Sequence, residues 1–373
     1  MKPGLSSSWK PVFMLIVVLM VMIEVSCMAQ STTSKLVSTT WLKANLTQAD
    51  IRIIDLRQDV KDYWQAHIPG AVYFNPEALR LADEGVPVKL MPPEAIAIML
   101  GKMGIDENTH IIIYAEQNDF KAPYLIWALD YIGHPQASIL DGGFSQWQKE
   151  NLPVTQDYPK IKAVDYSPSS KINQDVRANL DDVKEMVNRG GAVLLDVRPV
   201  EMYNGEKGNW KRTGHIPGAI NHFWGDDLNA DGTWKSTEAL KQAYEEIGAT
   251  PDKLIIVSCG QGLMSASVYF VLKHILGYPR VKNYDGGFNE WSNSDTLPVE
   301  KSSGGPSFGV PASMPTGAAL VAERCTKCHD QKRINKQKLN QAGWEKLVNQ
   351  MIHRGAKLSP EEHQLVVDYL SSR

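Results

Sequence analysis

Cys259 lies where the sequence changes from an apolar run to a glycine-containing turn. The run Leu254-Ile255-Ile256-Val257-Ser258 predicts a buried strand, and the apolar-periodic segment from Ser265 to Leu276 predicts a helix. Gly260-Gln261-Gly262 connects the two. A cysteine at such a helix N-terminus meets unpaired backbone N–H groups, which stabilise a thiolate and can surround an anion. The alternative is a buried structural thiol, but the glycine-containing turn after a strand favours a nucleophile.

A second set of reactive side chains is Cys325-Thr326-Lys327-Cys328-His329, a C-x-x-C-H motif. This spacing is the attachment signature of c-type haem, in which two thioethers hold the porphyrin and the histidine ligates iron. A zinc site would require more Cys or His ligands, and a redox pair would not need His329. We therefore expect one covalent haem c, bound by Cys325, Cys328 and His329.

The residues after this motif are expected to complete the haem site. The segment from Gly343-Trp344 to Leu358-Ser359 resembles small monohaem class I cytochromes c. That resemblance implies Met351 as the sixth ligand, and His353 is the alternative. A methionine on a helix is also a common core residue. We expect residues 318–373 to form a small all-α haem domain, since a segment this short buries only a marginal core unaided.

Length and charge limit the function classes. The chain has 373 residues, which predicts two or three domains, and its net charge of −3 gives no basic footprint for nucleic acid. Lys2 and Lys10 precede an apolar run from Val12 to Ile23 that is short for a membrane span. We expect residues 1–29 to be a signal peptide and the protein to be exported to the periplasm, where haem is attached. Lipid attachment at Cys27, which would tether the chain to a membrane, and an uncleaved anchor are the alternatives.

An internal repeat sets the architecture. Four motifs recur in the same order, namely Asp-x-Arg, His-Ile-Pro-Gly-Ala, Asp-Gly-Gly-Phe and Leu-Pro-Val. They begin at Asp55, His67, Asp141 and Leu152 in the first copy and at Asp196, His215, Asp285 and Leu297 in the second. Short apolar strands alternate with helical segments, which predicts α/β domains with parallel sheets covered by helices. We expect domains at 36–155 and 176–300 and a linker at 301–317.

These paired motifs, together with Cys259-Gly260-Gln261-Gly262-Leu263-Met264, resemble the tandem rhodanese family, which includes thiosulfate and mercaptopyruvate sulfurtransferases. The resemblance implies that Cys259 becomes a persulfide. It also implies a set of residues that hold the persulfide or the substrate: Gly260, Gln261, Gly262, Leu263, Met264, Ser265, Arg198 and Arg212. The first repeat has Ala115 in place of Cys259, followed by Glu116 and Asp119, so we expect it to be non-catalytic.

Two positions differ from thiosulfate-specific members of that family. Gln261 stands where they have a cationic loop residue, and Met202 stands where they have an arginine before an aromatic residue. Lys207, Lys211 and Arg212 could supply positive charge instead, or form a solvated loop. Cysteine phosphatases are disfavoured, because Ser265 stands where their loop ends in an arginine that clamps phosphate.

The sequence therefore predicts a sulfurtransferase. It would move sulfane sulfur from thiosulfate or, more favourably for this loop, from polysulfide or a persulfide to a thiophilic acceptor such as cyanide, a thiol or sulfite. The alternatives are an electron-transfer cytochrome of sulfur oxidation, with the repeats as a sulfur-binding or docking module and a redox partner protein, and a carrier without turnover.

Overall fold

The computed structural model describes residues 35–168, 172–302, 320, 321, 334, 337, 339–353, 358 and 360–371. The expected signal segment, Cys27 and the haem-attachment residues Cys325, Cys328 and His329 lie outside these ranges. In the part of the chain that is described, no helix is both long enough and apolar enough to span a membrane.

The first repeat is built on one sheet of five parallel strands. In sheet order the strands are β1 (Leu36–Val37), β7 (Ala137–Leu140), β6 (His110–Tyr114), β2 (Ile51–Asp55) and β3 (Val72–Tyr73). The two central strands, β6 and β2, are rich in isoleucine, which suits a strand buried on both faces. The helices of this repeat are α1 (Thr39–Asn45), α2 (Val60–Gln65), α3 (Pro93–Lys102), α4 (Lys121–Ile132) and α5 (Gly143–Lys149).

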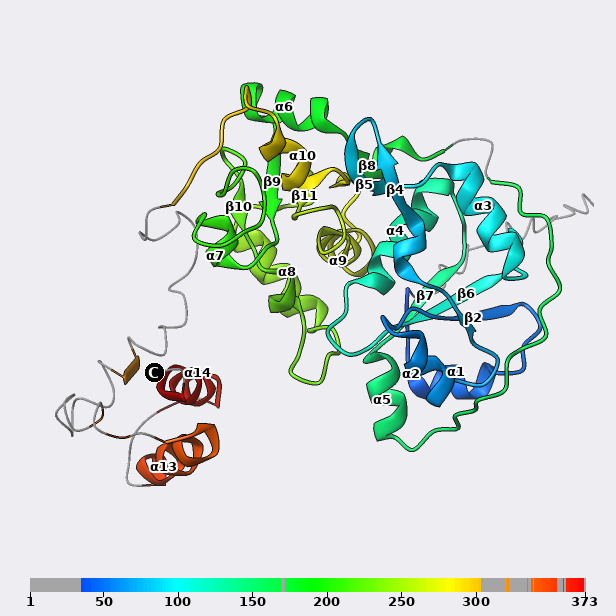
Figure 1. Cartoon of the computed structure of the whole chain (residues 1–373), viewed down its shortest axis with the longest axis horizontal. Coiled ribbons are helices and arrows are strands. Elements are labelled where there is room, and N and C mark those ends of the chain that lie inside the picture. The colour runs from blue at the N-terminus through cyan, green and yellow to red at the C-terminus, as the bar shows by residue number, and fades with distance from the viewer. Residues whose placement is uncertain are drawn as a thin grey trace, which may run out of the picture. The chain divides into compact units, whose positions relative to one another are not determined.

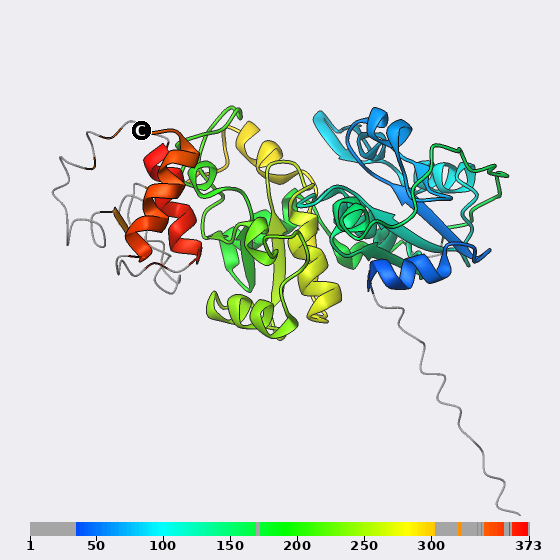
Figure 2. The same ribbon diagram turned by 90° about the horizontal axis from the view of Figure 1, so that it is seen from below.

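The second repeat has the same strand order, which confirms the predicted duplication. Its parallel strands are β10 (Ile220–Asn221), β9 (Ala192–Asp196), β11 (Leu254–Ser258), β12 (Val281–Tyr284) and β8 (Arg177–Ala178). Its helices are α6 (Leu180–Arg189), α7 (Val200–Tyr203), α8 (Thr237–Glu246), α9 (Ser265–Phe270) and α10 (Gly287–Asn293), and a π-helical segment, η4 (Val271–Ile275), continues α9. Figures 1 and 2 show the two sheets with their helices from two directions.

Both repeats contribute to one apolar core. This core includes Ile113 and Trp127 of the first repeat and Val257 and Phe270 of the second, all buried. Helices α4 and α9 pack against each other, and the hydroxyl of Tyr269 on α9 donates to Asp130 Oδ2 on α4 at 2.9 Å. Smaller clusters cover the other face of each sheet. The repeats therefore share a packed interface, which allows one repeat to shape a site in the other.

The first repeat also contains an antiparallel hairpin, which has no counterpart among the named strands of the second repeat. It consists of β4 (Arg80–Asp83) and β5 (Val86–Leu90). The hairpin contacts the second repeat: the backbone N–H of Leu90 donates to Asp285 Oδ2 at 2.8 Å, and Lys89 Nζ lies 3.1 Å from Glu290 Oε1. Figure 1 shows it in blue beside the second sheet.

Within the described residues of the C-terminal segment, the named helices are α13 (Gln341–His353) and α14 (Pro360–Ser371). They pack through an apolar cluster that includes Trp344, Val348, Val366 and Leu370. Met351 is partly buried on α13. The helices agree with the expected all-α character of this segment, and the cytochrome assignment stays a prediction.

Candidate active site

Cys259 is the first residue after β11, the central strand of the second sheet. Helix α9 begins at Ser265, so strand, turn and helix follow one another as predicted from the sequence. The carboxyl ends of parallel strands are where open α/β sheets place their ligands. Cys259 is 2% exposed and is a free thiol. Sulfur carried there would be shielded from water.

Two glycines allow the turn after Cys259 to close tightly. Gly262 has φ +76°, and a Cβ there would lie 2.6 Å from the backbone oxygen of Asp285. Gly287, the second glycine of the Asp-Gly-Gly-Phe motif, has φ +58°, and a Cβ there would lie 2.8 Å from both Cys259 O and Gln261 N. The backbone N–H of Phe288 donates to Cys259 O at 2.8 Å. The Asp-Gly-Gly-Phe motif of the second repeat thus packs directly against the Cys259 turn.

Substitution of Gly287 by alanine is expected to lower kcat for sulfur transfer by roughly 10- to 100-fold, because the added methyl group must displace the Cys259 backbone. Gly218→Ala is the matched control: Gly218 also has a positive φ, +75°, but a Cβ there meets nothing within 4 Å. Steady-state kinetics on both variants measure the difference. Equal losses of kcat would show that backbone strain, and not contact with the turn, causes the effect.

A buried polar chain supports the turn from below. The hydroxyl of Ser265 lies 3.5 Å from Cys259 Sγ and 2.6 Å from Asn283 Oδ1, and Asn283 Nδ2 donates to Gly262 O at 2.9 Å. Ser265, which was predicted to hold the persulfide or substrate, therefore lies next to the thiol, and its role there stays a prediction. Asn283 is a site residue that the sequence analysis missed. A signal existed, because the first repeat has Ile139 at the matching strand position.

Arg198 was expected to bind substrate, and this expectation is wrong. Its side chain is fully buried and pairs with Asp196, with Nε 2.9 Å from Oδ1 and Nη2 2.5 Å from Oδ2. Nη2 also donates to Gly214 O at 2.8 Å. The guanidinium carbon lies 4.2 Å from the centroid of the Phe288 ring and 5.0 Å from that of Trp210. These contacts make Arg198 a structural residue beneath the site.

Arg212 was also expected to bind substrate, but its guanidinium binds backbone carbonyls of the protein instead. Its guanidinium donates to four backbone carbonyls at and beyond the end of α10, those of Trp291, Ser292, Ser294 and Leu297. A cation at a helix C-terminus satisfies carbonyls that have no partner in the helix. Arg212 therefore ties the insert before His215 to α10.

Replacing Arg212 by methionine is expected to reduce the free energy of unfolding by about 1.5–3 kcal/mol, because charged hydrogen bonds to these carbonyls are lost. The Michaelis constant for the sulfur donor should stay within twofold of the wild-type value. Chemical denaturation and kinetics below the unfolding transition test both statements. A large rise in the Michaelis constant without loss of stability would restore the substrate-binding interpretation.

The lysines of the same insert pair at the surface. Lys207 lies 3.8 Å from Glu201, and Lys211 lies 2.7 Å from Asp295; in both pairs the side chains are at least 43% exposed. They fit a solvated loop better than an anion site. From the same insert, Trp210 contacts the turn, since a Cβ on Gly260 would lie 2.6 Å from its Cζ2.

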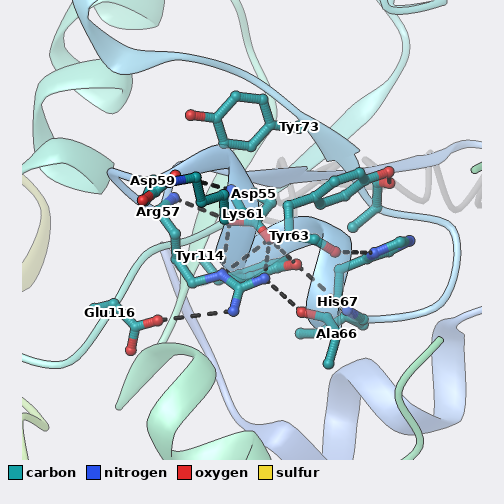
Figure 3. A network of polar contacts seen from close by, with 12 residues as sticks. Asp55, Arg57, Asp59, Lys61, Tyr63, Ala66, His67, Tyr73, Tyr114 and Glu116 are labelled. Carbon is teal, nitrogen blue, oxygen red and sulfur yellow. Dashed lines mark hydrogen bonds and ion pairs between the residues drawn. The ribbon is translucent and has the colours of Figure 1, made fainter. Parts of the chain in front are cut away.

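The motifs that both repeats share hold each domain together. Figure 3 shows this in the first repeat, where Asp55, Arg57 and Tyr114 form a buried network and Arg57 donates to Ala66 O. His67 of the His-Ile-Pro-Gly-Ala motif stacks on Tyr63, with ring centroids 3.8 Å apart. His215 stacks on Tyr203 in the same way, at 3.7 Å. These interactions do not depend on Cys259.

The turn of the first repeat differs where it would need to bind an anion. Ala115 occupies the position of Cys259, and Glu116 Oε1 lies 3.8 Å from Arg57 Nη1 (Figure 3). Asp119 Oδ2 pairs with Lys121 Nζ at 2.6 Å. The carboxylates thus neutralise cations and would repel an anionic ligand. This geometry supports the expectation that the first repeat is non-catalytic.

Comparisons with known proteins agree with this arrangement. The family model described as "Rhodanese-like domain" matches residues 38–150 and 179–294. The sulfur carrier protein TtuD of Thermus thermophilus is 35% identical over 277 residues, which are 71% of this chain and 96% of the relative. The 3-mercaptopyruvate sulfurtransferase of Escherichia coli K12 is 34% identical over 280 residues, 72% of this chain and 98% of the relative.

A solved structure supports the same assignment. The crystal structure of SseA from Escherichia coli, a 3-mercaptopyruvate sulfotransferase, matches with a TM-score of 0.60 and 33% identity, over 68% of this chain and 99% of that one. The family model matches both repeats, and this chain covers nearly the full length of these relatives. These findings lead to one assignment. The chain belongs to the rhodanese-like family as a tandem-domain sulfurtransferase.

Proposed function

We propose that this enzyme transfers sulfane sulfur through a persulfide on Cys259. One observation carries the proposal: the turn after β11 holds a free thiol, shaped by Gly262 and Gly287, whereas the matching turn of the first repeat holds Ala115 and two carboxylates. A thiolate is the nucleophilic form of cysteine. The turn between Cys259 and Ser265 contains no acidic residue that would repel an anionic donor.

The proposed reaction has two half-reactions. In the first, Cys259 Sγ attacks the outer sulfur of thiosulfate, an S–S bond forms, and sulfite leaves with the electron pair of the broken S–S bond. In the second, a nucleophile such as cyanide attacks the outer sulfur, thiocyanate leaves, and the Cys259 thiolate is regenerated. Backbone N–H groups of the turn are suited to stabilise the transferred negative charge.

The donor is proposed to be a small sulfane-sulfur compound, either thiosulfate or a polysulfide. The relatives' names also include 3-mercaptopyruvate as a substrate, so this third donor belongs in the comparison. The test incubates the full chain with each donor, and mass spectrometry of the peptide containing Cys259 measures the gain of one sulfur atom. Addition of cyanide should remove that sulfur and release an equal amount of thiocyanate. A chain that forms no persulfide with any donor would contradict the proposal.

We also propose that residues 318–373 carry a covalent c-type haem. The donor set supports this: Cys325 and Cys328 are suited to form the thioethers, and His329 and Met351 are suited to ligate iron. Such a group would supply one-electron transfer to a redox partner protein, and the electron-transfer cytochrome of sulfur oxidation remains the second candidate function. The absorbance of the denatured, extracted chain tests for covalent haem, and Cys325→Ala/Cys328→Ala should abolish it.

Export to the periplasm, with Cys27 as the alternative lipid-attachment site, completes the proposal. Haem attachment of this kind takes place outside the bacterial cytoplasm, so the two proposals support each other. The mass of the mature N-terminus distinguishes cleavage before Gln30 from lipidation at Cys27.

A further inference from the structure

The turn that carries Cys259 contains no charged residue between positions 259 and 265. A cation nevertheless reaches it from the other repeat. Arg80, the first residue of β4, donates from Nη2 to the backbone oxygen of Gln261 at 3.1 Å and to its side-chain Oε1 at 3.3 Å. The first repeat thus places an arginine against Gln261, the residue that stands where thiosulfate-specific relatives have a cation.

The environment of Arg80 is built to hold this guanidinium. Its side chain is 4% exposed, and Nη1 lies 3.3 Å from Glu77 Oε2, whose own side chain is 49% exposed. The guanidinium carbon lies 6.0 Å from the centroid of the Tyr124 ring. Arg80 Nε is buried and has no hydrogen-bond partner in the part of the chain that is described. A poorly solvated, permanently charged group of this kind acts strongly on its neighbours.

The bond to Gln261 fixes the direction of a peptide group. In a trans peptide the C=O of one residue and the N–H of the next point in opposite directions. With Gln261 O held by Arg80, the N–H of Gly262 points away from Arg80. The positive φ of Gly262 and its close approach to Asp285 hold the other side of that peptide. Arg80 therefore orients one of the N–H groups of the turn.

Charged groups besides Arg80 also lie near the turn: Asp285, against Gly262, and its partner Arg177, at 2.9 Å. Glu77, which pairs with Arg80, is half exposed, so water screens its charge more than that of the buried groups. Burial raises the pKa of Asp285, and the charges of Arg177, Arg80 and Lys89 oppose that rise. When Asp285 is ionised, it disfavours a second anion nearby, and Arg80 offsets this repulsion. Without Arg80 the balance of charge at the turn would become less favourable to a thiolate or persulfide.

We propose that Arg80 is a positioning residue for sulfur transfer, supplied by the non-catalytic repeat to the turn of the catalytic repeat. It orients the Gln261–Gly262 peptide and provides the positive charge that Gln261 and Met202 do not. The proposal rests on the proposed function of Cys259. It also gives the first repeat a role in catalysis without a nucleophile of its own.

The test compares Arg80→Gln and Arg80→Lys with a matched control, Gln117→Ala. Gln117 occupies the position of Gln261 in the first repeat and makes the mirrored contact, donating to Ala230 O of the second repeat at 2.9 Å. The control therefore removes a contact between the repeats at the turn without a thiol. The unfolding temperature of each variant is measured first.

Two readouts separate positioning from simple stability. The first is kcat for thiocyanate formation, which Arg80→Gln is expected to lower by roughly tenfold, less than the 10²- to 10³-fold cost of deleting a direct donor. The second is the pH at which iodoacetamide labels the Cys259 peptide at half its maximal rate. Loss of the positive charge should move this midpoint to higher pH. Arg80→Lys should keep the midpoint and lose part of kcat, because an ammonium cannot reproduce the planar fork.

Gln117→Ala should leave both readouts unchanged. An Arg80→Gln variant that folds and shows the wild-type midpoint and kcat would overturn the proposal, as would an equal effect of Gln117→Ala. A wild-type chain that transfers no sulfur would contradict the proposed function instead. The labelling midpoint would still test the effect of Arg80 on Cys259.

Discussion

Replacement of Cys259 by serine is expected to reduce thiocyanate formation by roughly 10³-fold or more, the scale on which enzymes lose activity when a covalent nucleophile is removed. A hydroxyl is a far weaker nucleophile than a thiolate and does not form a stable bond to sulfane sulfur. Serine is nearly isosteric with cysteine, so it should fill the same space in this buried turn and leave the fold intact. Initial rates with thiosulfate and with polysulfide measure the effect.

The matched control for this prediction is Ala115→Cys, which places a thiol at the equivalent position of the first repeat. If the turn and not only the thiol is needed, Cys259→Ser/Ala115→Cys should remain inactive, because the turn after position 115 contains the carboxylates of Glu116 and Asp119. Recovery of activity in the double variant would contradict the claim that carboxylates disable the first repeat. Residual activity above a few per cent in Cys259→Ser would indicate a second route for sulfur.

The sequence was sufficient for the features that depend on local order along the chain. The duplicated α/β architecture follows from the repeated motifs and buried strands. The location of Cys259 follows from the strand, turn and helix order, with β11 ending at Ser258 and α9 beginning at Ser265. The helix predicted from Ser265 to Leu276 is α-helical only to Phe270, and the π-helical η4 (Val271–Ile275) follows, which the apolar pattern did not indicate.

The side-chain roles were predicted less well, because a charge in the sequence does not reveal its partner. Arg198 and Arg212 carry the right charge near the right motifs, yet one is paired with Asp196 and the other binds the carbonyls beyond α10. Arg80 gave no signal at all, since its contact with Gln261 joins residues 181 positions apart. Contacts of this kind depend on how the two repeats pack, which no local pattern encodes.

The structural role of Arg198 leads to a large expected effect on stability. Replacement of Arg198 by methionine should reduce the free energy of unfolding by about 3–5 kcal/mol, because it leaves the carboxylate of Asp196 buried without its charged partner. Asp196 is 3% exposed and lies at the end of β9, one strand from β11. Denaturant titration followed by circular dichroism measures the change.

Lys207→Met is the control, because it removes a cation from an exposed ion pair and not from a buried one. Lys207 pairs with Glu201 in an exposed position, so its removal should change stability by no more than about 0.5 kcal/mol. The double variant Asp196→Leu/Arg198→Met adds a second comparison. If an unpaired buried charge causes the loss, replacing both partners by apolar side chains should recover part of the stability that the single variant loses.

If instead Arg198 served mainly to bind a sulfur donor, the single variant would keep its stability and lose affinity for the donor. The geometry argues against that outcome. The ring of Phe288 lies 4.2 Å from the guanidinium, and this residue also donates its backbone N–H to Cys259 O. Arg198 therefore acts on the thiol through the packing of Phe288 and Trp210, since both residues contact the Cys259 turn. Loss of the ion pair should lower stability first, and displacement of the Cys259 turn should follow from it.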